Sequence, residues 1–306
     1  MKTNKTKWFR FLTLFLVSSV GTFTACNNDE DMGGDGQISM QVTDAPIDAE
    51  GVTGVYITFT GIEYQKDGGS WEIFEEFEGP VTINLLELQN GKTALLGDFN
   101  AGAGNYTGFR FLLDAESQGN TSSTSGCYMT FEDGTEKPLF VPSGDQTGYK
   151  AIADFSVPVN GTVEVTADFD LRKSVAKAGA TGMYLLKPTI RTIVNNESGE
   201  IKGNISNTEE GKNYVVFAYE EGTYTEEEAS EPTKEAPRFP NAITSTGAKA
   251  SGEFVVAFLA PKAHELIFVE FDAEGNPTVV KTKSNIKVES KKSVEVDVAI
   301  ELGISL

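Results

Sequence analysis

The sequence is poor in the side chains on which most catalytic and metal sites depend. Its 306 residues include a single histidine, His264, and two cysteines, Cys26 and Cys127. Tetrahedral zinc sites and disulfide scaffolds need several such residues, so both are excluded. A Ser-His-Asp or Cys-His device would have to use His264, and no G-x-S-x-G motif accompanies it. We therefore predict a protein that is not an enzyme, with no cofactor, no metal site and a structural Cys127. A weak Ca²⁺ site in a loop of so acidic a chain is the alternative.

Positive charge is also scarce. The 25 lysine and arginine residues stand against 45 aspartate and glutamate residues, which gives a formal net charge of −20. An anionic surface repels phosphate backbones, so nucleic-acid binding is excluded. The 20 phenylalanine and 9 tyrosine residues exclude a disordered acidic tail. Paired carboxylates for glycoside cleavage remain an alternative, because the many acidic residues offer many pairs.

Beyond residue 25 no segment resembles a membrane span, but the N-terminus has the pattern of an export signal. Residues 1–25 carry four basic residues and no acidic one, with an apolar stretch over 11–17. Phe23-Thr24-Ala25-Cys26 resembles a bacterial lipobox, which implies cleavage before Cys26 and attachment of diacylglycerol and palmitate there. We predict that residues 1–25 are a lipoprotein signal peptide and that Cys26 is the lipid attachment site. An ordinary signal peptide with a coincidental cysteine is the alternative.

Residues 26–36 continue as an acidic and glycine-rich stretch that is typical of a flexible tether. The acidic run 29–31 resembles the signal that sends Bacteroidota-type lipoproteins to the outer face of the outer membrane. We therefore expect an outer-membrane protein that is lipid-anchored at the cell surface, with the periplasmic face as the alternative. Its membrane partner is reached through the acyl chains on Cys26.

The remainder of the chain reads as strands. Apolar residues alternate with polar ones, and Asn90-Gly91, Asp133-Gly134 and Asn160-Gly161 are turn signals between the runs. Short helices are expected only at 85–88 and 173–178. We predict a mainly β fold of two β-sandwich-like domains of antiparallel strands with few short helices. The expected strands are 37–43, 53–66, 71–74, 81–85, 106–113, 127–131, 151–157, 163–169 and 183–194, then 201–205, 214–219, 254–259, 266–271, 278–282, 286–288 and 294–300.

Six motifs in order carry a resemblance in the first half. They are Asp44-Ala45-Pro46, Asn84-Leu85-Leu86-Glu87-Leu88, Ala103 to Arg110, Val141-Pro142-Ser143-Gly144, Asp168 to Ser174 and Leu186 to Arg191. Over about residues 37–195 the chain resembles the bacterial lipoprotein family known as domain of unknown function 4382. The resemblance implies a secreted, membrane-anchored β domain, and it implies no catalytic residue.

Residues 199–306 begin a second set of strands. Ser251-Gly252-Glu253-Phe254 and the strand that follows make this half similar to transthyretin-like or carboxypeptidase-regulatory-like β-sandwiches. That resemblance implies a stalk or accessory module. The segment 220–249 interrupts the strands with an acidic loop rich in Glu, Thr, Pro and Ala. We expect this loop to be solvated and disordered, with a partner-contacting loop as the alternative.

Four charged residues gather at the expected end of one strand: Asp168, Asp170, Arg172 and Lys173. Strand ends of a rigid sandwich often present binding groups, so these are candidate ligand-binding residues. Internal ion pairs are the alternative, and we favour them because such patterns more often serve the fold. Trp71 is a further candidate, as a surface on which a sugar ring stacks, although we favour a core anchor.

The function that follows is non-catalytic. We predict an envelope-anchored lipoprotein that acts as a structural, adhesive or ligand-binding module, with a glycan or a protein as its ligand. An extracellular glycan hydrolase with paired carboxylates is one alternative. A fimbria-like subunit that assembles by strand exchange is the other.

Overall fold

The computed structural model describes residues 34–45, 51–115, 126–141, 148–178, 183–230, 237–273 and 275–300. The expected signal peptide, Cys26 and the tether up to residue 33 lie outside the described residues. In the described part of the chain, no helix is long and apolar enough to cross a membrane.

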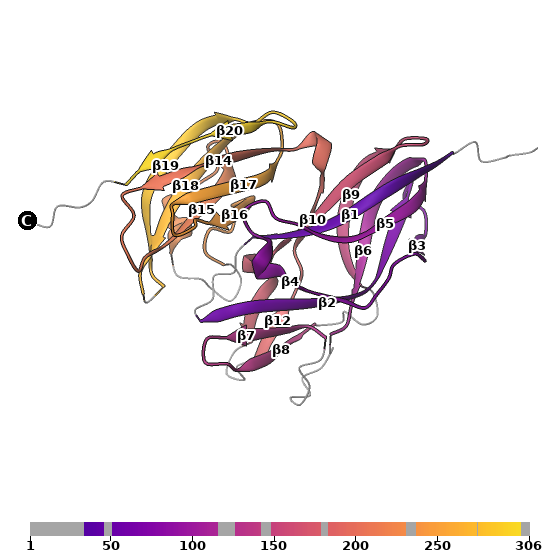
Figure 1. Ribbon diagram of the computed structural model, residues 1–306, viewed down its shortest axis with the longest axis horizontal. Helices are drawn as coiled ribbons and strands as arrows, with labels where there is room; N and C mark the ends of the chain where they lie inside the picture. The colour runs from indigo at the N-terminus through magenta and orange to yellow at the C-terminus, as the bar shows by residue number, and fades with distance from the viewer. Residues whose placement is uncertain are drawn as a thin grey trace, which may run out of the picture. The chain divides into compact units, whose positions relative to one another are not determined.

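The N-terminal half contains a four-stranded sheet in the order β13-β10-β1-β5, of which Figure 1 labels β10, β1 and β5. Strand β1 (Asp35–Ala45) pairs in parallel with β10 (Thr162–Asp170) and antiparallel with β5 (Ala94–Gly102). Strand β13 (Ile190–Val194) closes the other side of β10. The parallel register places Thr43 opposite Asp168 and Ala45 opposite Asp170, so the ends of β1 and β10 lie together.

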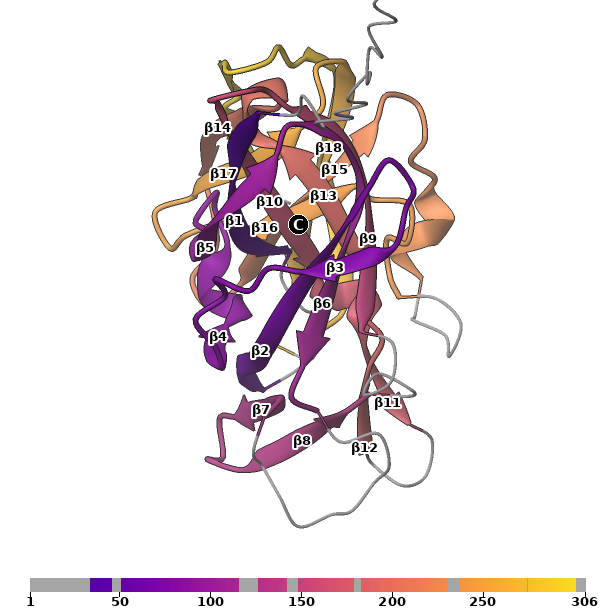
Figure 2. The same ribbon diagram turned by 90° about the vertical axis from the view of Figure 1, so that its right-hand side faces the viewer.

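A nine-stranded sheet forms the second layer of this half. Its order is β11-β12-β8-β7-β2-β6-β9, and β3 and β4 also pair with β2. Strands β7, β8, β11 and β12 lie together at the bottom of Figure 2. The bounds of all nine strands are β2 (Val52–Lys66), β3 (Trp71–Ile73), β4 (Val81–Asn84), β6 (Gly104–Leu113), β7 (Tyr128–Phe131), β8 (Glu136–Phe140), β9 (Tyr149–Val157), β11 (Val175–Ala178) and β12 (Met183–Leu186).

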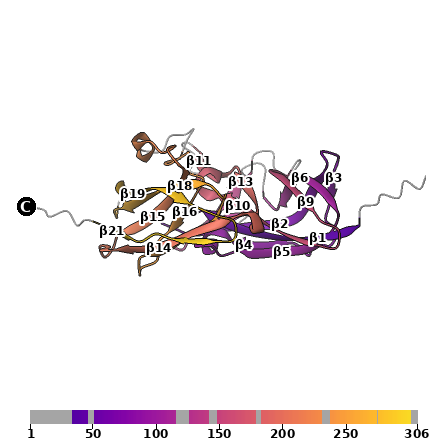
Figure 3. The same ribbon diagram turned by 90° about the horizontal axis from the view of Figure 1, so that it is seen from above.

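The two layers are joined by aromatic side chains from both sheets. Phe169 of β10 lies edge to face against Phe59 of β2 and Phe111 of β6, with ring centroids 5.7 and 5.6 Å apart. Phe99 of β5 stacks on Phe74 at 4.4 Å. Figure 3 shows β1 and β5 as one layer, with β6 and β9 as the other. The inward side chains of both sheets therefore share one core, as in a β-sandwich.

The C-terminal half repeats this arrangement with two four-stranded sheets, β17-β14-β20 with β21, and β16-β15-β18-β19. Phe254 of β17 and Phe268 of β18 meet edge to face at 5.5 Å, which joins the two sheets. The bounds are β14 (Gly199–Ser206), β15 (Asn213–Glu220), β16 (Thr244–Gly247), β17 (Glu253–Leu259), β18 (Ala263–Phe271), β19 (Pro277–Lys287), β20 (Ser293–Glu295) and β21 (Val298–Ala299).

The mainly β class with few short helices is confirmed, and the structure adds particulars. Four strand pairs are parallel instead of antiparallel: β1 with β10, β8 with β12, and β14 with β20 and β21. The expected helix at 173–178 is a single turn, α2 (Leu171–Ser174), followed by β11. The expected strand 183–194 is divided into β12 and β13, because Pro188 lacks a backbone donor for a continuous ladder.

Strand β5 was not expected, and a bulge explains why. Met40 faces Gly97 and Gln41 faces Leu95, so Leu96 is an extra residue in the ladder. The buried positions on β5 are Leu96, Phe99 and Ala101, and the three-residue spacing between the first two departs from the period of two that identifies a strand. Leu95 is left exposed as a result.

Replacing Phe169 by alanine tests the shared core. Because Phe169 is completely buried between the layers, Phe169→Ala should lower the free energy of unfolding by about 3–5 kcal/mol, measured by urea denaturation. Ile152 is 86% exposed on β9, and Ile152→Ala should change it by less than about 0.5 kcal/mol. Equal effects of the two substitutions would contradict the assignment of Phe169 to the core.

Candidate functional site

The charged cluster named from the sequence lies where β10 ends and α2 begins. Asp168, Asp170 and Arg172 are 3, 5 and 5% exposed, so all three are inside the protein. The Ser174 hydroxyl donates to the Asp170 carbonyl at 2.6 Å and closes the turn. Arg172 Nε and Nη2 donate to the two carboxylate oxygens of Asp170 at 3.1 and 2.8 Å. The ion pairing favoured from the sequence is therefore present, as a bidentate pair.

Arg172 and the neighbouring Lys173 also bind residues of the C-terminal half. Arg172 Nη1 donates to the Phe239 carbonyl at 3.2 Å, and its guanidinium lies 5.3 Å from the centre of the Phe217 ring. Lys173 Nζ donates to the Ala242 carbonyl at 2.8 Å and also lies 3.3 Å from Asp170. These side chains therefore join the halves through backbone carbonyls. We call Asp168, Asp170, Arg172, Lys173 and Arg191 the junction cluster.

Asp168 takes a different partner, Arg191 of β13. Arg191 Nη2 donates to Asp168 Oδ2 at 2.7 Å, and Nη1 donates to the Phe258 carbonyl at 2.7 Å. Phe258 lies near the end of β17 with φ +58, an uncommon conformation for a bulky residue. Arg191 thus forms a second link between the halves. It belongs to the motif 186–191, but the sequence did not pair it with Asp168, because register sets that distance.

A third link comes from the turn after the short helix η1 (Leu85–Leu88). The Asn90 side chain donates to the Gly247 carbonyl at 3.0 Å and accepts from the Val255 amide at 3.0 Å. The Thr43 hydroxyl of β1 lies between the Leu88 and Lys92 carbonyl oxygens, at 2.9 and 2.8 Å, and holds this turn by donating its one hydrogen to them. The predicted turn geometry is confirmed by positive φ at both Asn90 and Gly91. Its role in joining the halves could not be read from sequence, because Gly247 and Val255 are far away along the chain.

The expectation of a disordered loop at 220–249 is wrong for its described residues. A short helix, η4 (Glu226–Ala229), begins with a capping box made by Thr225 and Glu228. Glu228 is buried and accepts from the Tyr219 hydroxyl at 3.0 Å and the Asn241 amide at 3.1 Å. Phe239 is fully buried and stacks on Phe217 at 4.1 Å. This loop therefore supplies the carbonyls that Arg172 and Lys173 bind.

Asp44 lies beside the junction cluster without a cation of its own. It is 5% exposed, and its Oδ1 accepts from the Leu171 amide at 3.3 Å. Burial raises the pKa of Asp44 well above its usual value, and the carboxylates of Asp168 and Asp170 raise it further. The end of β1 therefore places an acidic group where a negative charge is poorly compensated.

Trp71 is on the surface and not in the core, contrary to the favoured expectation. On β6, Phe109 and Phe111 point into the core, so Arg110 points to the opposite face of the sheet. The Arg110 guanidinium lies 4.2 Å from the centre of the partly exposed Trp71 ring, and Lys150 Nζ lies at 5.8 Å. We call Trp71, Arg110, Lys150 and the exposed Ile152 the Trp71 face. The structure does not bring Trp71 to the junction cluster.

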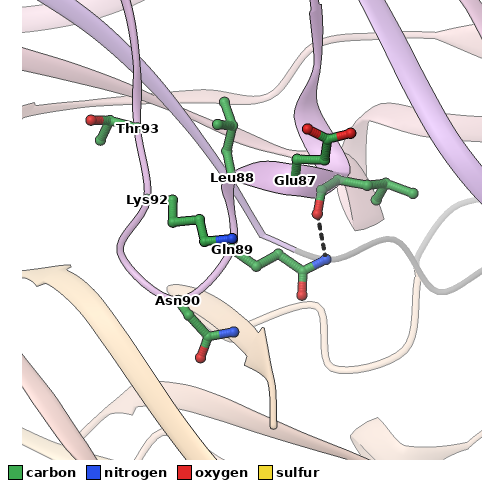
Figure 4. A pocket seen from close by; sticks show the side chains of 7 residues that line it. Glu87, Leu88, Gln89, Asn90, Lys92 and Thr93 are labelled. Carbon is green, nitrogen blue, oxygen red and sulfur yellow. Dashed lines mark hydrogen bonds between the residues drawn. The ribbon is translucent and has the colours of Figure 1, made fainter. Parts of the chain in front are cut away.

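An open hollow of about 740 Å³ is lined by residues 86–90, 92 and 93. Figure 4 shows Glu87, Lys92 and Thr93 around it, with Gln89 donating to the Leu86 carbonyl at 3.3 Å. Gln89 also accepts from the Gly247 amide, so the hollow adjoins the contact between the N-terminal and C-terminal halves. Its polar side chains carry no nucleophile with an adjacent base.

The two residues that nucleophilic catalysis would need are both buried. His264 is completely buried, with Nδ1 3.2 Å from the Tyr219 carbonyl oxygen and Nε2 2.8 Å from that of Ala260. Cys127 is 1% exposed, and burial raises its pKa to about 12. A thiol with that pKa stays protonated at neutral pH and is a poor nucleophile. In the described residues, no group of three or more His, Cys, Asp or Glu side chains is arranged for a metal ion.

Removing the Arg172 guanidinium should lower the stability of the protein. Arg172→Ala leaves the Asp170 carboxylate buried without its bidentate partner, so the free energy of unfolding should fall by about 3–5 kcal/mol in urea denaturation. Lys292→Ala, which breaks an exposed pair with Glu289, should have no measurable effect. If Arg172→Ala and the wild type unfold at the same urea concentration, the contacts of Arg172 contribute nothing to stability.

Comparison with solved structures finds several bacterial proteins of low similarity. The Bacillus anthracis TIE protein is 9% identical with a TM-score of 0.22, over 87% of this chain and 34% of that chain. The minor pilin of the gram-positive pathogen Streptococcus agalactiae is 13% identical with a TM-score of 0.22, over 86% and 94%. The gamma-CGTase of the alkalophilic Bacillus clarkii is 13% identical with a TM-score of 0.25, over 71% and 34%.

This chain thus spans about a third of the length of the first and third of these proteins. TM-scores this low support no argument about fold or function. No curated protein matches the sequence.

One family model does match, and it covers half of the chain. The model for a domain of unknown function, DUF4382, matches residues 35–188. This segment runs from β1 to β12 and includes Asp44, Asp168, Asp170, Arg172 and Lys173. The C-terminal half lies outside the match, so its transthyretin-like resemblance stays a prediction. The chain belongs to the DUF4382 family.

Proposed function

We propose that the chain is a lipid-anchored, non-catalytic module of the bacterial cell envelope that presents a rigid β body to a ligand. The observation that carries this proposal is the use of the junction cluster inside the protein. Arg172, Lys173 and Arg191 donate to backbone carbonyls of the other half and to Asp168 or Asp170. Groups engaged in this way hold the two halves together and are not free to transfer protons.

The anchor belongs to the proposal. Cys26 in its lipobox-like context would attach the chain to the outer membrane, and the stretch 26–36 would act as the tether. The acidic run 29–31 favours the cell surface over the periplasmic face. A net charge of −20 is suited to a solvated protein outside the cell and is unsuited to nucleic acid.

The Trp71 face is the surface that we propose for ligand contact. A Cβ at Gly108 would lie 3.1 Å from Trp71 Cη2, so the missing side chain allows the indole to lie against the sheet. Arg110 is held by Glu63 at 2.7 Å, so it is already oriented beside the ring. An indole with neighbouring cations on a rigid sheet fits a glycan, whose apolar ring face stacks while its polar groups meet charged side chains. We favour a glycan over a protein ligand for that reason.

The two alternatives are less well supported. A glycan hydrolase needs two acids free to act beside the sugar, but Glu63 is paired with Arg110 and Glu72 accepts from the Tyr64 hydroxyl. A fimbria-like subunit needs an edge that accepts another strand. The edge strand β19 starts with a proline and carries Lys283 and Lys287, features that discourage pairing between edges.

Membrane attachment is tested at Cys26. Cys26→Ala removes the thiol to which lipid would be joined, so the protein should move from the membrane fraction to the soluble envelope fraction after cell lysis. Cys127→Ala is the matched control, because it removes the other cysteine, and its product should stay in the membrane fraction. Continued membrane association of Cys26→Ala would contradict the lipoprotein assignment.

Ligand contact is tested at Trp71 with the chain from residue 27 on a glycan array. The Trp71→Ala variant should lose at least about tenfold in affinity for any glycan bound by the wild type, which corresponds to ~1.4 kcal/mol. Tyr128→Ala is the matched control, since Tyr128 stacks on Tyr56 elsewhere in the same sheet. Binding that depends on Tyr128, or no glycan binding at all, would contradict the proposed ligand face.

A further inference from the structure

Three charged side chains form one row across the outer face of the nine-stranded sheet. Glu63 of β2 lies opposite Arg110 of β6, and Arg110 lies opposite Lys150 of β9. Side chains directly opposite each other on neighbouring strands have Cβ atoms about 4.5–5.5 Å apart. The two cations of the row are therefore neighbours, and the one carboxylate of the row lies on the far side of Arg110.

This order of charges is unfavourable for the protein by itself. Arg110 Nη1 donates to Glu63 Oε2 at 2.7 Å, so that carboxylate is already engaged. Lys150 is exposed and forms no ion pair within the described part of the chain. Like charges directly opposite each other destabilise a sheet, whereas an acidic residue at position 150 would complete an alternating row. The stability of the fold therefore does not explain Lys150, and an anion bound beside Lys150 and Arg110 would offset their repulsion.

Two other acidic residues of this region do not take the place of such an anion. Glu72 accepts from the Tyr64 hydroxyl, and Tyr64 packs against the core, so Glu72 lies on the opposite face of the sheet from Trp71. Asp154 shares the outer face of β9 with Lys150, but the four positions that separate them correspond to about 13 Å along the strand. Exposed charges that far apart are largely screened at physiological ionic strength, where the Debye length is ~8 Å.

An apolar surface adjoins the two cations. A Cβ at Gly108 would lie 3.1 Å from Trp71 Cη2, and Gly108 lies opposite Ile152 in the ladder. The indole and the Ile152 side chain are therefore neighbours, and Ile152 is 86% exposed. On the outer face of β9, Ile152 has Lys150 on one side and Asp154 on the other. The Trp71 face thus offers an apolar surface with a positive end.

We propose that the Trp71 face selects an acidic glycan, whose carboxylate or sulfate group binds Lys150 beside Arg110. A sugar ring of the same glycan packs on Trp71 and Ile152. This inference rests on the glycan contact proposed above and adds the charge of the ligand. The Lys150 ammonium donates a charge-assisted hydrogen bond to the anionic group, and such a bond is roughly twice as strong as a neutral one.

The charge of the whole chain limits how acidic the ligand is. A net charge of −20 opposes a polymer that carries an anionic group on every unit. An isolated acidic sugar meets chiefly the charges within a Debye length of it, and in the row of Glu63, Arg110 and Lys150 these are two cations and one paired carboxylate. The expected ligand is therefore a glycan in which acidic sugars are separated by uncharged ones.

The test is a glycan array in which each acidic glycan is paired with its uncharged counterpart, probed with the chain from residue 27. Glycans with an isolated uronic acid are paired with their methyl esters, and glycans with an isolated sulfate are paired with the same glycans without sulfate. The acidic member should bind at least about tenfold more tightly. A preference in only one of the two sets identifies the anionic group as carboxylate or as sulfate. Heparin represents a densely charged polymer and should bind more weakly than the acidic glycans.

A single substitution locates the preference. Lys150→Gln should lower the affinity for the acidic glycan at least about tenfold and leave that for its uncharged counterpart unchanged. Its Tm should stay within about 2 °C of the wild-type value, because an exposed side chain outside the core contributes little to stability. Lys287→Gln is the matched control, because it removes an exposed lysine from β19 in the C-terminal half, and it should keep the full affinity.

The outcomes separate this inference from the proposed function. Equal binding of acidic and uncharged glycans that still depends on Trp71 would keep the glycan-binding face and overturn its preference for charge. Equal losses in Lys150→Gln and Lys287→Gln, or tighter binding of heparin, would show a general attraction between charges and overturn the inference as well. No binding to any glycan would overturn the proposed ligand face and this inference together.

Discussion

The buried guanidinium of Arg172 is the group on which the arrangement of the two halves depends. It carries a full charge at a residue that is 5% exposed, and removing such a charge from water is costly unless every donor is engaged. Asp170 satisfies one side of it and the Phe239 carbonyl satisfies another. Both halves must therefore be folded and in contact for Arg172 to be stable where it is.

This requirement explains the acidic loop. The sequence of 220–249 looks unable to form a core, yet Phe239 is fully buried. Glu228 links two parts of this segment by accepting from the Asn241 amide, and it links the segment to β15 by accepting from the Tyr219 hydroxyl. Residues 239–242, which offer carbonyls to two cations, have to be held in one conformation. The hydrogen bonds of Glu228 to Asn241 and Tyr219 provide that, so this acidic side chain serves structure as well as solubility.

The division of charge has a consequence for function. The cations that the sequence predicts as candidate ligand-binding groups join the halves, whereas Arg110 and Lys150 lie beside a partly exposed tryptophan. On a chain with net charge −20, two cations next to a partly exposed aromatic ring form a local exception.

The sequence by itself determined the β class, the turn at Asn90-Gly91 and the single turn at 85–88, because these follow from local periodicity and backbone preference. It also identified the family, and it named Asp168, Asp170, Arg172 and Lys173 as a group because they are neighbours along the chain. Only the tertiary structure decided their partners, since Phe239, Ala242 and Arg191 are brought to them by strand register and by the packing of one half on the other. The sequence wrongly favoured a core position for Trp71 for the same reason. Contacts with residues distant in sequence decide which face of the sheet a short edge strand covers.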